Sequence, residues 1–191
     1  MGIEEKPKLV HWNYFLAFDS DVEKLSRYIE FTKKNEKTYS IELVRLLLSA
    51  ASEVDVVAKL LCNKVKPDEN AGNMEDYRNI LNPIFPKIRD MKIQIRRYGL
   101  DLTPWEKWNE NKAPIWWKDY NGVKHQRDIN FQKANLKNTL NSIAGLYCLL
   151  LYYYRDEAEK GNLIPYPNLF SVSRKFQSNT ISVQSRPLYK L

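Results

Sequence analysis

The sequence contains little cysteine and little glycine. Its two cysteines, Cys62 and Cys148, lie far apart and neither belongs to a C-x-x-C pair, so the sequence predicts neither a zinc site nor a redox motif. We expect both to be buried free thiols in a reducing compartment. The 6 glycines are too few for the many tight turns of an all-β chain.

Signals for export or membrane insertion are also missing. The most apolar run, residues 143–154, is shorter than a bilayer-spanning helix and is interpreted as a core helix. The first residues, MGIEEKPKL, are charged and lack the apolar centre of a signal peptide. We therefore expect a cytoplasmic protein without a membrane partner.

The common motifs for phosphate, dinucleotide and metal chemistry are absent. The chain has no G-x-x-x-x-G-K-[ST], no G-x-G-x-x-G and no H-E-x-x-H. No serine or cysteine stands in a nucleophile elbow. ATP hydrolysis, dinucleotide redox chemistry, zinc hydrolysis and α/β-hydrolase chemistry therefore lack a motif, and we expect no cofactor and no metal.

Positive charge, by contrast, is in excess. The chain has 30 Lys and Arg against 23 Asp and Glu, which gives a net charge of +7. Such a balance favours polyanionic partners. The excess is concentrated in residues 162–191, which contain no acid and four cations: Arg174, Lys175, Arg186 and Lys190.

Hydrophobic periodicity predicts a mainly all-α chain. Apolar residues recur at helical spacing in four segments, residues 19–35, 40–64, 74–81 and 131–155. Asp19 is a candidate N-cap of the first helix, and Ser40 of the second. The heptad-like seam of residues 131–155 predicts that this helix packs against residues 40–64 as an antiparallel partner. We expect these helices to form one domain, residues 1–161.

Two segments depart from the helical pattern. Residues 91–98 alternate apolar and polar side chains before Gly99, which indicates a small β-hairpin within about residues 91–105, although helical spacing competes in the same stretch. Residues 162–191 contain two prolines and a serine-rich alternation. They predict an extended basic C-terminal arm, with a strand at residues 179–184.

The stretch IWWKDYNGVKHQRD combines aromatic residues, cations and one of only 2 histidines. If a helix begins near Tyr120, Asn121 and His125 lie one turn apart on one face. The free N–H groups of that helix start favour an anion. Arg127 can then grip a phosphodiester with its forked guanidinium, Lys124 adds a point charge, and His125 can move a proton near neutral pH.

The same residues have a non-catalytic interpretation. Lys124 and Arg127 can be solvated cations, and the neighbouring aromatic rings can be core packing instead of platforms for bases. If the chain binds nucleic acid, six side chains form the predicted surface: Lys118, Tyr120, Lys124, Arg127, Arg174 and Lys175.

Two carboxylates on the helix predicted at residues 40–64 need partners. Glu53 and Asp55 lie among aliphatic residues, where an ionised carboxylate requires a donor. The cations and the histidine of the stretch around His125 are candidate donors. The contact is then either a buried salt bridge between two helices or a carboxylate that orients His125. The other histidine, His11, is expected to be structural.

Three segments together resemble the HEPN superfamily of small bacterial helical proteins. They lie within residues 19–155 and read TYSIELVRLLLSAASEVDVVAKLLC, PWEKWNENKAPIWWKDYNGVKHQRD and ANLKNTLNSIAGLYCLLLYYY. The resemblance implies an antiparallel bundle of four or five helices that is usually a dimer. It further implies a metal-independent ribonuclease of bacterial defence or toxin–antitoxin systems, with RNA as substrate and an antitoxin as a partner.

The resemblance also implies roles for individual residues. By position, His125 matches the motif histidine, Asn121 its polar companion, and Glu53 or Asp55 the assisting residue. The family's arginine precedes the histidine, whereas Arg127 follows it here. Three functions stay open: a metal-independent endoribonuclease, a related module that binds nucleic acid or nucleotide without cutting it, and a structural dimerisation protein.

Overall fold

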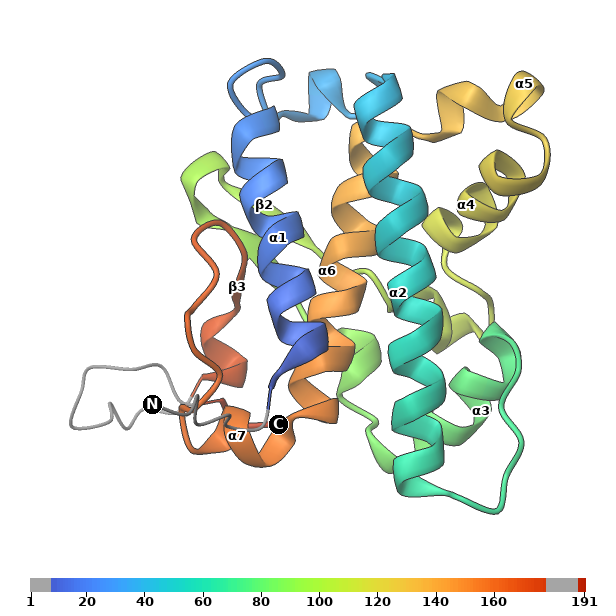
Figure 1. Ribbon diagram of the computed structural model, residues 1–191, viewed down its shortest axis with the longest axis vertical. Coiled ribbons are helices and arrows are strands. Elements are labelled where there is room, and N and C mark those ends of the chain that lie inside the picture. The colour runs from blue at the N-terminus through green and yellow to red at the C-terminus, as the bar shows by residue number, and fades with distance from the viewer. Residues whose placement is uncertain (1–7, 178–188) are drawn as a thin grey trace, which may run out of the picture.

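Three long helices lie side by side at the centre of the fold (Figure 1). They are α1 (Val10–Leu25), α2 (Ile41–Val65) and α6 (Leu136–Tyr153) in a computed structural model that describes residues 8–177 and 189–191. α6 is the innermost helix, because its side chains are buried from Leu136 to Tyr152 apart from Lys137 and Asn141. A helix that is apolar on nearly all sides is stable only when other elements cover it.

The two longest helices run in the same direction. Thr139 at the start of α6 donates a hydrogen bond to the carbonyl of Leu43 at the start of α2 (3.3 Å). At the other end, Lys64 of α2 donates to the carbonyl of Tyr153 (2.8 Å). The predicted pairing of these helices is confirmed, but the predicted antiparallel direction is wrong. An apolar seam specifies the contact face and not the direction, and the long connection through residues 66–135 allows the chain to return to the same end and run parallel.

The first helix begins earlier than predicted. α1 starts at Val10, not at Asp19, and it runs antiparallel to α6, with the ring of Trp12 5.8 Å from that of Tyr147. Aromatic residues upstream of Asp19 continue the apolar stripe: Trp12, Phe15 and Phe18 are buried. Asp19 is therefore a buried residue inside the helix and not its N-cap.

The other helix boundaries follow local capping signals. The Ser40 side chain accepts from the Leu43 amide (3.2 Å), as predicted for the N-cap of α2. Asn73 caps α3 (Met74–Ile84) and Asn135 caps α6. The helix predicted at residues 131–155 is thus divided, since a short 3-10 helix, η5 (Phe131–Lys133), precedes Asn135 and α7 (Arg155–Glu159) follows.

The predicted hairpin is present. β1 (Ile93–Ile95) and β2 (Leu100–Leu102) pair antiparallel, and Gly99 at the turn has a φ of 63°, which favours glycine. β3 (Ser171–Val172) adds to the other edge of β1. The strand predicted at residues 179–184 lies outside the described residues. The remaining short helices are η1 (Lys33–Asn35), η2 (Ile88–Asp90), η3 (Arg96–Tyr98), η4 (Glu106–Glu110), α4 (Ile115–His125), α5 (Arg127–Asn130) and η6 (Arg174–Phe176).

The described part of the C-terminal segment packs into the core. The carboxylate of Asp19 accepts hydrogen bonds from the backbone amides of Asn168, Leu169 and Phe170 at 2.7–3.1 Å. Tyr189 is buried, and its hydroxyl lies 3.0 Å from that of Tyr147. Figure 1 shows this segment and the hairpin on the α1 side of the fold, and α3, α4 and α5 on the α2 side.

Both cysteines are buried free thiols, as predicted. Burial raises the pKa of Cys62 to about 12 and raises that of Cys148 as well, so neither is a ready nucleophile. In the described ranges, no helix combines the length and the apolar character needed to cross a membrane.

Candidate functional site

The predicted site lies at the corner between α4 and α5. α4 begins at Ile115, directly after Pro114, and His125 is its last residue. The expectation of a helix start near Tyr120 is therefore wrong. The end of α4 presents carbonyl groups, which repel an anion, so an anion at this corner has to be held by side chains. Gln126, with φ −143° and ψ 64°, breaks the helix before Arg127 opens α5.

The aromatic side of α4 faces the core. Trp116 donates its indole N–H to the carbonyl of Pro104 (2.9 Å) and packs edge-on against Trp105. Tyr120 is only 5% exposed. These contacts support the packing interpretation of the aromatic residues, because a buried ring offers no open face on which a base can stack.

The opposite side of the corner carries exposed polar groups. Lys118, Lys124, His125 and Arg127 are all exposed, and Asn121 is partly buried one turn before His125. The Lys124 ammonium lies over the Tyr120 ring, 5.7 Å from its centre. Among the residues that the structure describes, none of these three cations forms an ion pair. The corner thus presents three cations without an ion pair, Lys118, Lys124 and Arg127, beside the exposed imidazole of His125.

Glu53 is not paired with His125. Its Oε1 lies 2.5 Å from Nδ1 of His11, the other histidine. The side chains of His11 and Glu53 are 21% and 12% exposed. The interpretation of a carboxylate that joins two helices holds in kind, but the second helix is α1. The pair of His11 and Glu53 could be predicted from the sequence only if the first helix was predicted to begin at Val10.

Asp55 is likewise engaged elsewhere. It accepts from the hydroxyl of Tyr77 on α3 (2.7 Å) and from Lys59 one turn along α2 (2.6 Å). Burial is the main cause of the raised pKa of Tyr77, and the bond to Asp55 adds to it. In residues 8–177 and 189–191 neither Asp55 nor Glu53 therefore makes a hydrogen bond to the corner.

Two predicted nucleic-acid contacts lie on another surface. Arg174 and Lys175 are exposed on η6, which Phe176 anchors in the core. Figure 1 places η6 next to β3, across the central helices from α4 and α5. The structure does not bring Arg174 and Lys175 together with Lys124 and Arg127. The six predicted residues therefore do not form one continuous nucleic-acid-binding surface.

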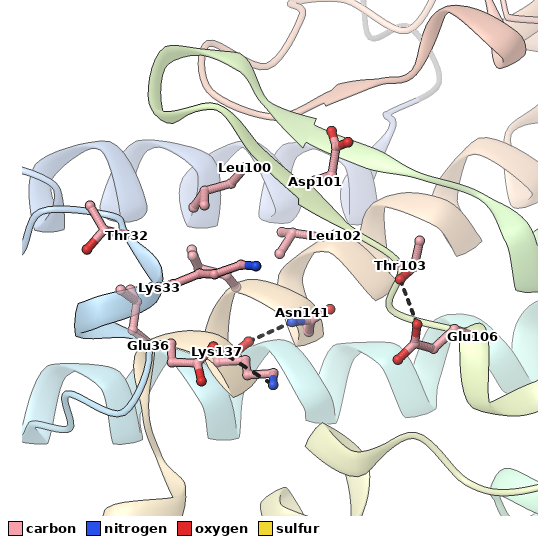
Figure 2. Close-up of a pocket in the computed structure, with 12 residues that line it drawn as sticks. Thr32, Lys33, Glu36, Leu100, Asp101, Leu102, Thr103, Glu106, Lys137 and Asn141 are labelled. Carbon is pink, nitrogen blue, oxygen red and sulfur yellow. Dashed lines mark hydrogen bonds and ion pairs between the residues drawn. The ribbon is translucent and has the colours of Figure 1, made fainter.

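A pocket of about 260 Å³ that the sequence did not indicate opens between β2 and the start of α6 (Figure 2). Leu100 and Leu102 line one side, while Lys137 and Asn141 line the other. Lys137 lies 3.9 Å from Glu36, which offsets its charge. The first amides of α6 are taken by the carbonyls of Thr38 and Glu36 and by the side chain of Asn135. The start of α6 therefore offers this pocket no free backbone N–H group for an anion.

No group of three or more metal-ligating side chains occurs in the described part of the chain. Comparisons with protein-family models, with curated proteins and with solved structures find no match. The resemblance to the HEPN superfamily stays a prediction, and the function has to be argued from the arrangement of the residues.

Proposed function

We propose that the protein binds RNA through the exposed cations of the α4–α5 corner. The observation that carries this proposal is that Lys118, Lys124 and Arg127 are exposed and have no carboxylate partner among the described residues. Lysine and arginine that neutralise phosphates supply most of the affinity for nucleic acid, and the guanidinium fork suits phosphate oxygens.

The contrast with Lys59 of α2 and with Lys66, which directly follows α2, supports this choice. Lys59 and Lys66 each face a carboxylate, at 2.6 Å from Asp55 and 2.5 Å from Glu69. Their charges are thereby offset locally. A polyanion that approaches the α4–α5 corner meets no such neutralisation, although Asp128 on α5 is exposed there and lowers the net charge.

The test is RNA binding by fluorescence polarisation at several salt concentrations. We expect the triple variant Lys118→Ala, Lys124→Ala, Arg127→Ala to bind at least about tenfold more weakly at low salt. The slope of log affinity against log salt should fall in magnitude by about 2, because each phosphate contact contributes about 0.7. The matched control removes three exposed but paired cations, Lys59, Lys66 and Lys112. Equal affinity and slope in both triple variants would refute the proposal.

Metal-independent cleavage of the bound RNA by His125 is the second candidate function. Its imidazole is exposed and takes part in no hydrogen bond within the described residues. His125 would take the proton of a ribose 2′-hydroxyl, whose oxygen then attacks the adjacent phosphorus. The 2′-oxygen–phosphorus bond forms, the bond between phosphorus and the 5′-oxygen breaks, and the leaving 5′-oxygen takes a proton from water. Lys124 and Arg127 would stabilise the charge on the phosphorane.

Cleavage is tested on structured and single-stranded RNA with EDTA throughout. Wild-type protein should yield 2′,3′-cyclic phosphate ends, and His125→Ala should not, while its RNA affinity stays unchanged. DNA should resist, because it lacks the 2′-hydroxyl. If wild type and His125→Ala both bind RNA and neither cuts it, cleavage is refuted and RNA binding without catalysis is the function that is supported. The homodimer and the antitoxin partner stay predictions.

A further inference from the structure

One end of the bundle joins the α4–α5 corner to a segment far away in sequence. The rings of Tyr39 and Phe131 meet edge-on, with centres 5.7 Å apart and an interplanar angle of 88°. The backbone of Tyr39 pairs with that of Asn135, and the carbonyl of Thr38 accepts from Leu136 (2.9 Å). Figure 1 shows η1, the start of α2, the connection before α6, and α5 along this end.

A second group of cations lies on the far side of this aromatic contact. Lys33, Lys34 and Lys37, in and just after η1, are exposed. Within residues 8–177 and 189–191 they form no ion pair, whereas the nearby Glu36 is paired with Lys137. The end of the bundle thus has cations on η1 and cations on α4 and α5, with Tyr39 and Phe131 between the two groups.

Exposed apolar surface accompanies these cations. Tyr39 is 52% exposed; Ile41, two residues after it, is 81% exposed, and Ile129, two residues before Phe131, is 64% exposed. A half-exposed aromatic ring beside groups of cations is an arrangement that suits single-stranded nucleic acid. The phosphates contact the cations while an unpaired base stacks on the ring.

We propose that single-stranded RNA crosses this end of the bundle, from the η1 lysines over Tyr39 and Phe131 to the α4–α5 corner, with one base stacked on Tyr39. The inference rests on the proposed function and specifies the form of RNA. Bases of a duplex are stacked on each other and cannot present a face to Tyr39, so duplex RNA would contact the cations alone.

The experiment compares single-stranded and duplex RNA of equal length in the same polarisation assay. Tyr39→Leu should weaken binding of the single strand about tenfold, in keeping with the loss of one stacked base, and leave duplex binding unchanged. Tyr39→Phe keeps the ring and should bind like the wild type. The control Tyr14→Leu changes a similarly exposed tyrosine of α1, whose ring packs at a tilt against that of Phe18 away from this end. The triple variant Lys33→Ala, Lys34→Ala, Lys37→Ala should weaken single-strand binding and its salt dependence.

The outcomes separate the two proposals. If the α4–α5 triple variant loses RNA while Tyr39→Leu and the η1 triple variant do not, the path is refuted and the proposed function stands. Equal affinity of the wild type for duplex and single strand also refutes the path. If the wild type binds neither RNA, both proposals fail. If the protein does not bind RNA but sediments with phosphatidylserine vesicles, the proposal is refuted and this end of the bundle is assigned to a membrane surface. A circular dichroism melt of each variant confirms that it is folded.

Discussion

Glu53 of α2 fixes His11 of α1, with Oε1 and Nδ1 2.5 Å apart. The ring of Tyr153 stands edge-on to the imidazole at 5.8 Å, and Lys64 lies over that tyrosine ring. The backbone of His11 bonds to Tyr154, whose pKa is raised by burial and partly lowered by this bond. These contacts hold the first turn of α1 against the middle of α2 and the end of α6, so the pair of His11 and Glu53 supports the fold.

Replacement of Glu53 should therefore reduce stability. We expect Glu53→Ala to lower the free energy of unfolding by about 1–2 kcal/mol, because it removes a half-buried hydrogen bond and leaves His11 without its partner. Urea unfolding measures the loss. The control Glu69→Ala removes an exposed pair with Lys66 and should cost less than about 0.5 kcal/mol. Unchanged stability together with lost RNA cleavage would instead make Glu53 an assisting residue of the reaction.

Replacement of Asp19, a buried polar residue of α1, should strongly reduce the stability of the fold. Asp19→Ala leaves the amides of Asn168, Leu169 and Phe170 without their acceptor, and we expect a loss of about 2–4 kcal/mol. The C-terminal segment should also become sensitive to protease, which mass spectrometry of the fragments can locate. Asp68→Ala, in an exposed loop, is the control. If both variants are equally stable and equally resistant, Asp19 does not anchor the segment.

Local signals account for the elements that the sequence predicted well. Ser40 caps α2 and Gly99 turns the hairpin, and both depend on residues within a few positions. Asp19 has the residue type of an N-cap, but its partners lie 149–151 positions away. A local sequence pattern does not indicate a contact over such a distance. The start of the first helix was therefore wrongly predicted at Asp19.

The site could be predicted only in part for the same reason. Asn121 and His125 do lie one turn apart on α4, as their spacing indicated. The partners of Glu53 and Asp55 depend on how α1 and α3 pack against α2, which the spacing along one helix does not contain. The position of Tyr39 beside Phe131 likewise arises from tertiary packing.

Gly145 allows α6 to approach two tryptophans. A Cβ at this position would lie 3.1 Å from Trp116 and 3.4 Å from Trp105. Both indoles are held by hydrogen bonds, Trp105 to the Gly145 carbonyl itself, so they cannot easily move away. The overpacking should outweigh the gain of about 1 kcal/mol in helix propensity.

We therefore expect Gly145→Ala to lower the free energy of unfolding by about 1 kcal/mol and to change the tryptophan fluorescence. Gly72→Ala is the control, since its Cβ would meet nothing nearer than 3.9 Å. A Gly145→Ala variant that is more stable than the wild type would show that the indoles adjust to the added methyl group.

Glu42 should give a measurable pH dependence of stability. Arg45 binds both Glu42 (2.5 Å) and Asp21 of α1 (2.6 Å), and its hydrogen bond lowers the pKa of Glu42 below the ordinary value. A folded-state pKa below the unfolded one contributes stability above the unfolded pKa, and this contribution is lost as the pH falls through the folded pKa. The free energy of unfolding of the wild type should exceed that of Glu42→Gln by about 0.5 kcal/mol at pH 7. The difference is small because the pair of Glu42 and Arg45 is exposed. The difference should shrink as the pH falls below the ordinary glutamate pKa of about 4.3 and through the lower pKa of Glu42 in the folded state. Urea titrations across this range measure it, with the exposed Glu30→Gln as control. A difference that stays constant down to acid pH would mean that Arg45 does not distinguish the ionised carboxylate from the amide.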